Sequence, residues 1–455
     1  MSTKLITRNP YNGEELASYD LWDSKKIQAG LKISAKAYSS WRQTELWYRV
    51  DLLKKLSNVL ELRVDECAEM ISLEMGKTIR EAKAEVLKCA DASRYIAENA
   101  EAWLRPVEIE RGNKEAKVFF QPTGAVFAIM PWNFPFWQVI RQASTALAGG
   151  NVMILKHASN VTGCSILLEK LFLEAGFPKG VFQSFIIKSD LAEEVIAADI
   201  VSGVAFTGSE AGGRSVASIA GKLGKKVVLE LGGSDPFIVF EDVKLDVVVK
   251  EAVAARFQNA GQSCIAAKRF IVQDSIYNDF VKAFVKEIES LKLGDPMSED
   301  TQMGVLADKR FAKEVEQQVK ASIELGAKLH GTLKRKGASF APVVITNVKD
   351  TMPVWSEETF GPVAVVVSFK DIDDAVKKAN NTRFGLGAVI FSEDLSKAEK
   401  VALRIESGQV FINSMVRSDA AFPFGGIKAS GIGREMSDWG IKEFLNIKPV
   451  VFSKN

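Results

Sequence analysis

From Gly124 onward, short apolar segments alternate with longer segments whose apolar residues recur every three or four positions. The short segments predict buried strands and the longer segments predict helices. We expect strands at 124–130, 151–155, 201–209 and 225–233, and helices at 136–150, 162–176 and 210–222. Strands that are separated by helices form a parallel sheet covered on both faces. This part of the chain therefore predicts a doubly wound α/β unit.

A second series of the same kind follows. Its expected strands are 236–240, 268–274, 363–369 and 385–391, and its expected helices are 245–261 and 276–291. Residues from about 24 to 105 are also expected to be helical, because apolar side chains recur there at helical spacing. A chain of 455 residues exceeds what one hydrophobic core usually supports. The sequence therefore predicts an α/β protein with two doubly wound parallel-sheet domains, with Gly232–Gly233 as the expected hinge between them.

The charge balance and the lack of long apolar segments limit the classes of function. The chain has 59 basic and 57 acidic side chains, a formal net charge of +2, whereas nucleic-acid and membrane-surface proteins concentrate basic charge on one face. No apolar run reaches the roughly 20 residues that cross a bilayer. The N-terminal residues lack the apolar core of a signal peptide. We expect no nucleic-acid partner and no membrane association.

Cysteine and histidine are scarce, and neither shows a metal-binding pattern. The four cysteines are Cys67, Cys89, Cys164 and Cys264. Widely spaced thiols without a disulfide or metal pattern are typical of a reducing compartment, so a cytoplasmic location is expected. With only His157 and His330, a His-rich metal site or a Ser-His-Asp triad is hard to build. We expect no metal, and we interpret His157 as a structural residue.

Cys264 is the candidate nucleophile. It follows the segment FQNAGQS, in which a glycine interrupts the preceding helix. A thiol at such a turn can be exposed, and backbone N–H groups there lower its pKa. A lone cysteine can equally be a buried structural residue, so this segment by itself leaves both interpretations open.

Two further polar residues stand at the ends of expected strands. Glu230 ends an apolar strand, where parallel sheets place ligands and catalytic groups. It is expected to be a general base, with an ion pair to Lys225 or Lys226 as the alternative. Asn133 lies between two prolines that direct its side chain. It is expected to donate to an oxyanion, with capping of the following helix as the alternative.

Other motifs suit a dinucleotide. Lys156 and Ser159, in KHAS, offer an ammonium and a hydroxyl where dinucleotide-binding sheets usually have a carboxylate that repels a 2′-phosphate. Gly208 and Ser209 begin a glycine loop before a helix, which suits a pyrophosphate, although Ser209 can equally be only a helix cap. A second candidate pair, in SEETFGP, could hold the nicotinamide ribose and ring, or could form only a turn with a packed aromatic ring. This pair is Glu358 and Phe360.

Seven motifs occur in order along the chain: PWNFP, KHAS, FTGS, LELGG, FQNAGQSC, EETFGP and PFGGIKASGIGRE. Together they resemble the aldehyde dehydrogenase superfamily, and the resemblance covers essentially the whole chain. Within it, the sequence resembles the shorter, NADP-preferring bacterial succinate-semialdehyde dehydrogenases. The resemblance implies a non-phosphorylating, NAD(P)-dependent enzyme that oxidises an aldehyde to the acid and assembles as a homodimer or homotetramer.

The resemblance also implies residue roles. Cys264 matches the nucleophile that adds to the aldehyde, and Asn133, with the Cys264 backbone N–H, matches the oxyanion donor. Glu230 matches the base that activates water to hydrolyse the thioester left after hydride transfer. Most relatives have glutamate where this chain has Ser159, so NADP is expected to be preferred, with NAD also accepted. The implied cofactor contacts are Trp132, Lys156, Ser159, Gly208, Ser209, Leu231, Glu358 and Phe360.

The expected substrate is succinate semialdehyde or a similar short aldehyde with a carboxylate. Arg141 matches the arginine that holds this carboxylate in similar enzymes, and a guanidinium suits it through two parallel hydrogen bonds. Relatives often have a second arginine where this chain has Gln258, and Arg417 or Ser418 is the expected substitute. Alternatively, Arg141 forms only an ion pair on the helix surface, and the enzyme accepts aminoaldehydes or aliphatic aldehydes broadly. A non-catalytic scaffold of the same fold is a further alternative, which the three catalytic residue types argue against.

The resemblance finally implies domain boundaries. The dinucleotide-binding domain is expected at 1–112 and 123–231, the catalytic domain at 232–430, and a small β oligomerisation element at 113–122 and 431–455. This element contains the strand-like segments 115–122 and 443–452, which fit neither α/β series. Ordinary edge strands are an equally good interpretation of both segments.

Overall fold

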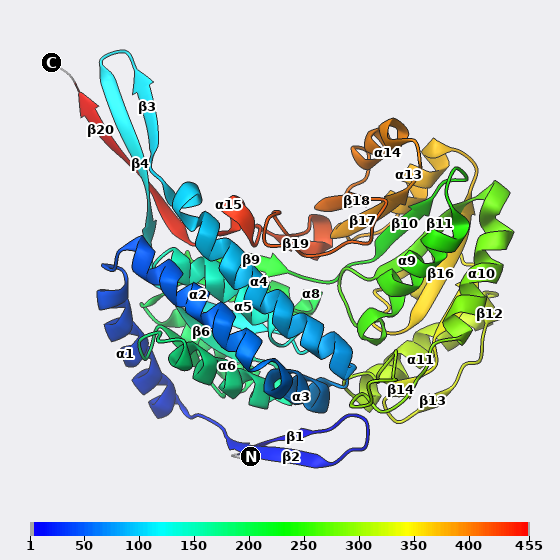
Figure 1. The fold of residues 1–455 in the computed structure, drawn as a ribbon, viewed down its shortest axis with the longest axis horizontal. Helices are drawn as coiled ribbons and strands as arrows, with labels where there is room; N and C mark the ends of the chain where they lie inside the picture. The colour runs from blue at the N-terminus through cyan, green and yellow to red at the C-terminus, as the bar shows by residue number, and fades with distance from the viewer. Residues whose placement is uncertain (1–3, 454–455) are drawn as a thin grey trace.

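The computed structural model of the protein describes residues 4–453. It consists of two α/β lobes and a projecting arm of three strands (Figure 1). A short antiparallel hairpin of β1 (Lys4–Arg8) and β2 (Glu15–Asp20) begins the chain. Within the described residues, no helix is both long enough and apolar enough to cross a membrane.

The first lobe is built on a six-stranded sheet with the order β19-β9-β8-β5-β6-β7. Consecutive residues of its central strands are buried, so both faces of the sheet are covered. All strands are parallel except β19, which is antiparallel to β9. The strands are β5 (Ala125–Met130), β6 (Val152–His157), β7 (Phe182–Ser184), β8 (Val201–Thr207), β9 (Lys226–Glu230) and β19 (Gly431–Ile432). The helices that follow them are α5 (Trp137–Ala148), α6 (Thr162–Glu174), α7 (Ala192–Ala197) and α8 (Glu210–Lys222).

The predicted helical region at 24–105 is confirmed and consists of four helices. They are α1 (Ser24–Trp41), α2 (Leu46–Leu62), α3 (Val64–Met75) and α4 (Ile79–Leu104). Gly76, with φ of +82°, ends α3. Thr78 and Glu81 then start α4 with a reciprocal capping pair, in which each side chain accepts from the other residue's backbone N–H. Helix α4 runs along the first lobe toward the second lobe (Figure 1).

The second lobe is built on a seven-stranded sheet with the order β12-β15-β16-β11-β10-β17-β18. Only β12 is antiparallel to its neighbour. Its strands are β10 (Asp235–Val239), β11 (Ala267–Gln273), β12 (Lys328–His330), β15 (Val343–Thr346), β16 (Val363–Phe369), β17 (Gly387–Phe391) and β18 (Gln409–Ile412). Its helices are α9 (Leu245–Phe257), α10 (Tyr277–Glu289), α11 (Lys309–Glu324), α12 (Pro353–Ser356), α13 (Ile372–Asn380) and α14 (Leu395–Ala402). A small hairpin, β13 (Arg335–Lys336) and β14 (Ser339–Phe340), and the short helix α15 (Ser437–Gly440) complete the elements.

Two predicted elements of this lobe differ in length. The helix expected at 245–261 ends at Phe257, because Asn259 and Ala260 adopt left-handed backbone angles with φ of +54° and +52°. The strand expected from residue 385 begins at Gly387. Gly232–Gly233, the expected hinge, lies between β9 of one sheet and β10 of the other.

The arm consists of β3 (Val107–Arg111), β4 (Lys114–Pro122) and β20 (Leu445–Ser453), with β4 antiparallel to both neighbours. The two strand-like segments predicted at 115–122 and 443–452 therefore lie in strands that pair with each other. The predicted boundaries need two corrections: residues 107–111 pair within the arm, and residues 431–432 pair with β9 in the first lobe. A strand's hydrogen-bonding partner decides its sheet, and the periodicity of a segment does not reveal that partner.

Candidate active site

Cys264 lies where two cavities adjoin. One cavity, of about 290 Å³, is lined by residues of the first lobe together with α11 and the segment after α12. The other, of about 740 Å³, is lined by α4, α5, α9 and the segment 415–424. Cys264 and Gln138 line both cavities. A half-buried sulfur in this position can contact a ligand in either cavity, which contradicts the alternative of a sealed structural cysteine.

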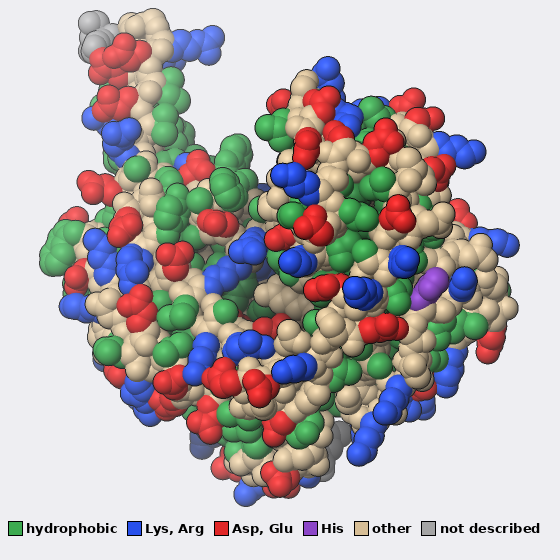
Figure 2. Space-filling view, turned by 45° about the vertical axis from the view of Figure 1, so that its right-hand side comes forward, with side chains coloured by type: hydrophobic (Ala, Val, Ile, Leu, Met, Phe, Trp, Pro, Cys, Tyr) green, Lys and Arg blue, Asp and Glu red, His purple; other side chains and the backbone are tan. Residues whose placement is uncertain are grey.

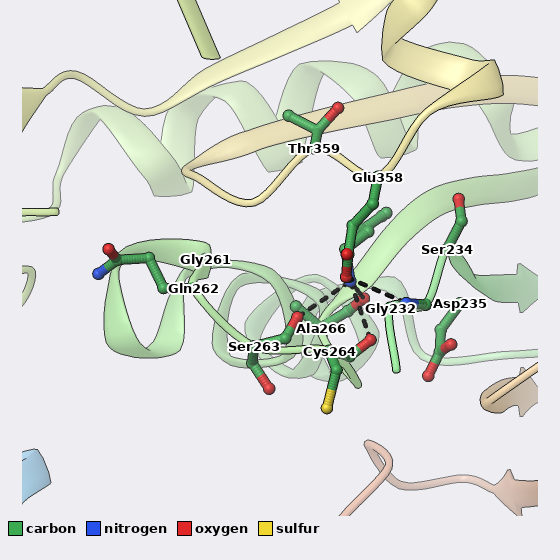
Figure 3. Close-up of polar contacts among 12 residues, drawn as sticks. Gly232, Ser234, Asp235, Gly261, Gln262, Ser263, Cys264, Ala266, Glu358 and Thr359 are labelled. Carbon is green, nitrogen blue, oxygen red and sulfur yellow. Dashed lines mark hydrogen bonds and ion pairs between the residues drawn. The ribbon is translucent and has the colours of Figure 1, made fainter. Parts of the chain in front are cut away.

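A network of hydrogen bonds fixes the loop that carries this sulfur. The side chain of Gln262 donates to the Asn259 carbonyl at 3.1 Å and accepts from the Ala307 N–H at 2.8 Å. The Lys268 ammonium donates to the carbonyls of Ser263 and Cys264, each at 2.9 Å. Figure 3 shows the Cys264 sulfur pointing away from the Glu358 carboxylate. The Lys268 ammonium thus binds the backbone of this loop on one side, and the Cys264 thiol points to the other side.

The thiol is protonated at neutral pH. Burial raises the pKa of Cys264 to about 12, while the positive charges of Arg141 and Lys268 act in the opposite direction. Since the thiolate is the nucleophilic form, the site needs a proton acceptor or a change in local charge before the sulfur reacts.

Asn133 lines the smaller cavity together with Cys264. Its side-chain N–H₂ donates to the Gln262 carbonyl at 3.1 Å, which leaves its second hydrogen for another acceptor. The alternative role as a helix cap is wrong. The first N–H groups of α5, those of Phe136 and Trp137, donate to the Glu85 carboxylate at 2.9 and 3.0 Å instead.

Glu230 ends β9, and its carboxylate is fully buried. Neither oxygen has a hydrogen-bond partner among residues 4–453. Burial and the negative charge of Glu435 raise the pKa of Glu230 well above its usual range. The alternative ion pair is wrong, because Lys226 pairs with Glu443 at 2.8 Å and Lys225 donates to backbone carbonyls. A buried carboxylate with unused acceptor capacity suits a proton acceptor.

Lys156 is the second-last residue of β6, paired with Ile129 of β5, and Ser159 follows the carboxyl end of β6. Burial lowers the pKa of Lys156, and in the described chain no carboxylate pairs with its ammonium. Ser159 is exposed. His157 between them is structural, as predicted: Nε2 donates to the Pro135 carbonyl at 2.9 Å, and burial lowers its pKa to about 4. A buried ammonium without a counter-ion fits the ribose and phosphate of a dinucleotide.

The smaller cavity also fits a dinucleotide. Gly208 and Ser209 line it at the start of α8, where Ser209 caps the helix by accepting from the Gly212 N–H at 3.2 Å. A Cβ on Gly208 would lie 2.8 Å from the Phe206 ring, so a larger residue would have to displace that ring. The remaining helix N–H groups can bind a pyrophosphate.

Aromatic rings and a carboxylate form the rest of that cavity wall. Trp132 stacks on Phe311 of α11 at 4.9 Å between centroids and meets the Phe360 edge at 5.7 Å. Glu358 accepts from the Gly233 N–H at 3.0 Å. Leu231 also lines the cavity. The predicted cofactor residues of the loops therefore lie together, whereas Lys156 and Ser159 lie outside this cavity.

The three predicted substrate residues, Arg141, Arg417 and Ser418, all line the larger cavity with Cys264. Arg417 is exposed, whereas Ser418 is buried. Arg141 does not form a surface ion pair: its Nε lies 2.6 Å from Glu435, and both side chains are 1% exposed. Glu435 therefore faces one side of the guanidinium, while the Arg141 Nη2 has no hydrogen-bond partner among residues 4–453.

Some residues of the site escaped the sequence analysis. These residues are Lys88 on α4, Glu435 after β19 and Phe311 on α11. Lys88 and Phe311 are common residue types on elements far from the recognised motifs. Glu435 stands within the quoted motif PFGGIKASGIGRE, so that motif was the one available signal. Only the packing of α4 and α11 against the cavities reveals the other two.

Comparisons with known proteins agree with this arrangement. The sequence model of the Aldehyde dehydrogenase family matches residues 1–450. The chain is 44% identical to succinate-semialdehyde dehydrogenase NADP(+) 1 of Mycobacterium tuberculosis, over 98% of this chain and 99% of that protein. It is 41% identical to the succinate semialdehyde dehydrogenase NAD(P)+ of Escherichia coli, over 99% of this chain and 98% of that protein.

A solved structure agrees as well. The crystal structure of succinic semialdehyde dehydrogenase from Streptococcus pyogenes, in complex with NADP+, superposes with a TM-score of 0.96 at 36% identity and covers 99% of this chain and 100% of that one. With a nearly full-length family match, a shared fold and a cysteine between two cavities, this chain belongs to the aldehyde dehydrogenase family.

Proposed function

We propose that this protein oxidises succinate semialdehyde, or a similar short aldehyde with a carboxylate, to the corresponding acid with NADP+. The observation that carries the proposal is the position of Cys264. It lines both the smaller cavity, with its aromatic rings, and the larger cavity, with its cationic side chains. The names of the M. tuberculosis and E. coli relatives support the same substrate.

The residues of this chain suit the roles of an aldehyde oxidation. The Cys264 thiol gives its proton to a water molecule, its sulfur forms a bond to the aldehyde carbon, and the Asn133 amide donates to the alkoxide of the thiohemiacetal. A bound nicotinamide dinucleotide supplies the hydride acceptor. Glu230 then takes a proton from water as the water oxygen attacks the resulting thioester, and the carbon–sulfur bond breaks. The unpartnered Glu230 oxygens have free acceptor capacity for that water.

The preference for NADP rests on Lys156 and Ser159. The ammonium of Lys156 has no carboxylate partner in the described chain, and the Ser159 hydroxyl carries no negative charge to repel a 2′-phosphate. NAD is expected to be a weaker acceptor.

An aldehyde panel, assayed by the absorbance of the reduced cofactor, tests the proposal. Succinate semialdehyde is expected to give a higher kcat/KM than pentanal, and NADP a higher kcat/KM than NAD. Equal values for the charged and uncharged aldehydes would contradict the substrate assignment, and a preference for NAD would contradict the cofactor assignment.

One observation favours the broader activity on uncharged aldehydes. Glu435 compensates the charge of Arg141, which weakens the residue expected to select a carboxylate. The panel separates the two functions, because a broad enzyme shows no advantage for the charged substrate.

The arm supports a homodimer or homotetramer. Its strands expose Val107, Ile109, Ile447, Val451 and Phe452, and green hydrophobic side chains are visible along it in Figure 2. Exposed apolar strands of this kind favour pairing with another chain. Light scattering at several protein concentrations tests the assembly. A cytoplasmic location is proposed from the four thiols, none of which forms a disulfide.

A further inference from the structure

Lys88 is a cation in the wall of the larger cavity that lacks an ion-pair partner within residues 4–453. Its Nζ lies 3.9 Å from the centroid of the Trp137 ring and donates to the Ser418 hydroxyl at 2.9 Å. Both Lys88 and Ser418 line the cavity that contains Cys264. The ammonium is therefore positioned by an aromatic face and a hydroxyl rather than by a carboxylate.

Glu85, Asp91 and Asp419 are acidic residues of the same cavity wall, and no ion pair joins any of them to Lys88 within residues 4–453. Asp91, one turn after Lys88, is exposed. Glu85, one turn before Lys88, forms a buried ion pair with Lys77 and accepts two backbone N–H groups at the start of α5. Asp419 accepts from the Ala421 N–H at 2.9 Å. The positive charge of Lys88 thus stays available to a ligand in the cavity.

The hydrogen bonds of the Ser418 hydroxyl indicate which kind of ligand the cavity would bind. Its oxygen accepts from the Trp137 indole N–H at 2.8 Å and from Lys88. Indole and ammonium groups only donate, and a hydroxyl oxygen has two lone pairs. Ser418 therefore has no acceptor capacity left, and its own O–H remains to be donated within the cavity. An ammonium beside a free O–H donor is suited to a carboxylate.

We propose that Lys88 and Ser418 together bind the carboxylate of the aldehyde substrate. This inference rests on the proposed function and adds Lys88 to the groups that select the carboxylate, with one side of the Arg141 guanidinium held by Glu435. Lys88 supplies a positive charge in a cavity wall where Gln258 carries none. The site selects short aldehydes with a terminal carboxylate over uncharged aldehydes of the same length.

Lys88→Met tests the inference, because methionine keeps an unbranched apolar stem on Trp137 and removes the charge. We expect kcat/KM for succinate semialdehyde to fall about 10- to 100-fold, since hydrogen bonds to charged groups contribute about 1.5–3 kcal/mol. The loss is expected in KM, while kcat/KM for pentanal changes less than about threefold. Lys83→Met is the matched control: Lys83 lies on the same helix, outside the cavity, in surface pairs with Asp65 and Glu299.

Product binding gives an independent measurement. Succinate is expected to inhibit the wild-type and Lys83→Met enzymes competitively against the aldehyde, and about tenfold or more weakly in Lys88→Met. Ser418→Ala keeps the lysine and removes the hydroxyl, so it tests the same site if Lys88→Met fails to fold. It is expected to lose selectivity for the carboxylate as well.

The outcomes separate this inference from the proposed function. If the wild-type enzyme does not prefer the charged aldehyde, the proposed function is contradicted. If the wild-type enzyme prefers it and Lys88→Met keeps both that preference and the inhibition by succinate, the assignment of Lys88 is wrong. Equal losses of kcat/KM for both aldehydes in Lys88→Met would also contradict this assignment, because they would indicate a structural role of Lys88.

Discussion

Arg141 and Glu435 form an ion pair inside the protein, with 2.6 Å between Nε and the carboxylate oxygen and 1% of each side chain exposed. Glu435 also raises the pKa of Glu230, while Arg141 lowers it. The Arg141 guanidinium lies 4.8 Å from the centroid of the Phe424 ring. This pair therefore links the larger cavity to the proposed base.

Removing Arg141 is expected to destabilise the protein. Arg141→Met leaves the Glu435 carboxylate buried without its counter-ion, a change that costs about 3–5 kcal/mol. Denaturant unfolding measures it. Arg94→Met is the control, because the Arg94–Glu61 pair, at 2.6 Å, is partly exposed and such pairs contribute at most about 1 kcal/mol. Similar decreases in the free energy of unfolding for both changes would show that burial does not make the Arg141–Glu435 pair more important to stability.

Iodoacetamide is expected to alkylate Cys264 and to spare the other three thiols. Cys264 is the half-buried thiol that lines the cavities, whereas Cys67, Cys89 and Cys164 are buried. With a pKa near 12, the thiolate fraction increases about tenfold for each pH unit between 7 and 9. Mass spectrometry after timed labelling measures the rate, and a plateau below pH 8 would contradict this pKa.

Cys264→Ala should abolish activity and retain dinucleotide binding.

Glu230→Gln is expected to slow thioester hydrolysis more than its formation. The amide keeps the shape of the side chain and cannot accept the proton of water. A rapid burst of reduced cofactor, close to one equivalent per site, should precede a steady rate reduced about 10²- to 10⁴-fold. Stopped-flow absorbance measures both phases. A reduced rate without a burst would place Glu230 in an earlier step.

Ser159→Glu is expected to reverse the cofactor preference. The new carboxylate would stand beside Lys156, repel a 2′-phosphate and accept hydrogen bonds from a ribose. The ratio of kcat/KM for NADP to that for NAD should fall by about tenfold or more. Because Ser159 is exposed, its replacement should leave thermal stability unchanged, and Ser159→Gln serves as an uncharged control. An unchanged ratio would show that this position does not contact the phosphate.

Selectivity for the carboxylate is expected to decrease at alkaline pH. Burial and the charge of Arg141 lower the pKa of Lys88 to about 8, against smaller opposing effects of Cys89, Glu85 and Asp419. Lys88 is therefore charged below pH 8 and neutral above it. The ratio of kcat/KM for succinate semialdehyde to that for pentanal should fall between pH 7 and 9, and using the ratio cancels titration of Cys264. A constant ratio would contradict the role of Lys88.

The strands and their terminal residues were largely predictable. The runs that became β5, β6 and β9 are apolar and short. Asn133 follows β5, Lys156 is the second-last residue of β6, and Glu230 ends β9. In a parallel sheet the carboxyl ends of all strands share one edge. The order of strands along the chain therefore indicated which polar residues would lie near one another.

The partners across the cavities were not predictable in the same way. Lys88 faces Trp137 and Ser418, which are 49 and 330 residues away in the sequence. Periodicity showed that α4 is a helix, but it did not show which face would line the cavity. The same limitation applied to β3, whose partner β4 places it in the arm.

The sequence by itself determined the element types and the chemical groups of the motifs, because hydrophobic periodicity and glycine or proline positions act locally. The tertiary structure decided which charges remain available to a ligand. Glu435 faces the Arg141 Nε because the fold brings the two together, and Lys88 has no ion-pair partner within residues 4–453 because Lys77 occupies Glu85. Electrostatic interactions depend on distance and burial in space, and neither quantity follows from separation along the chain.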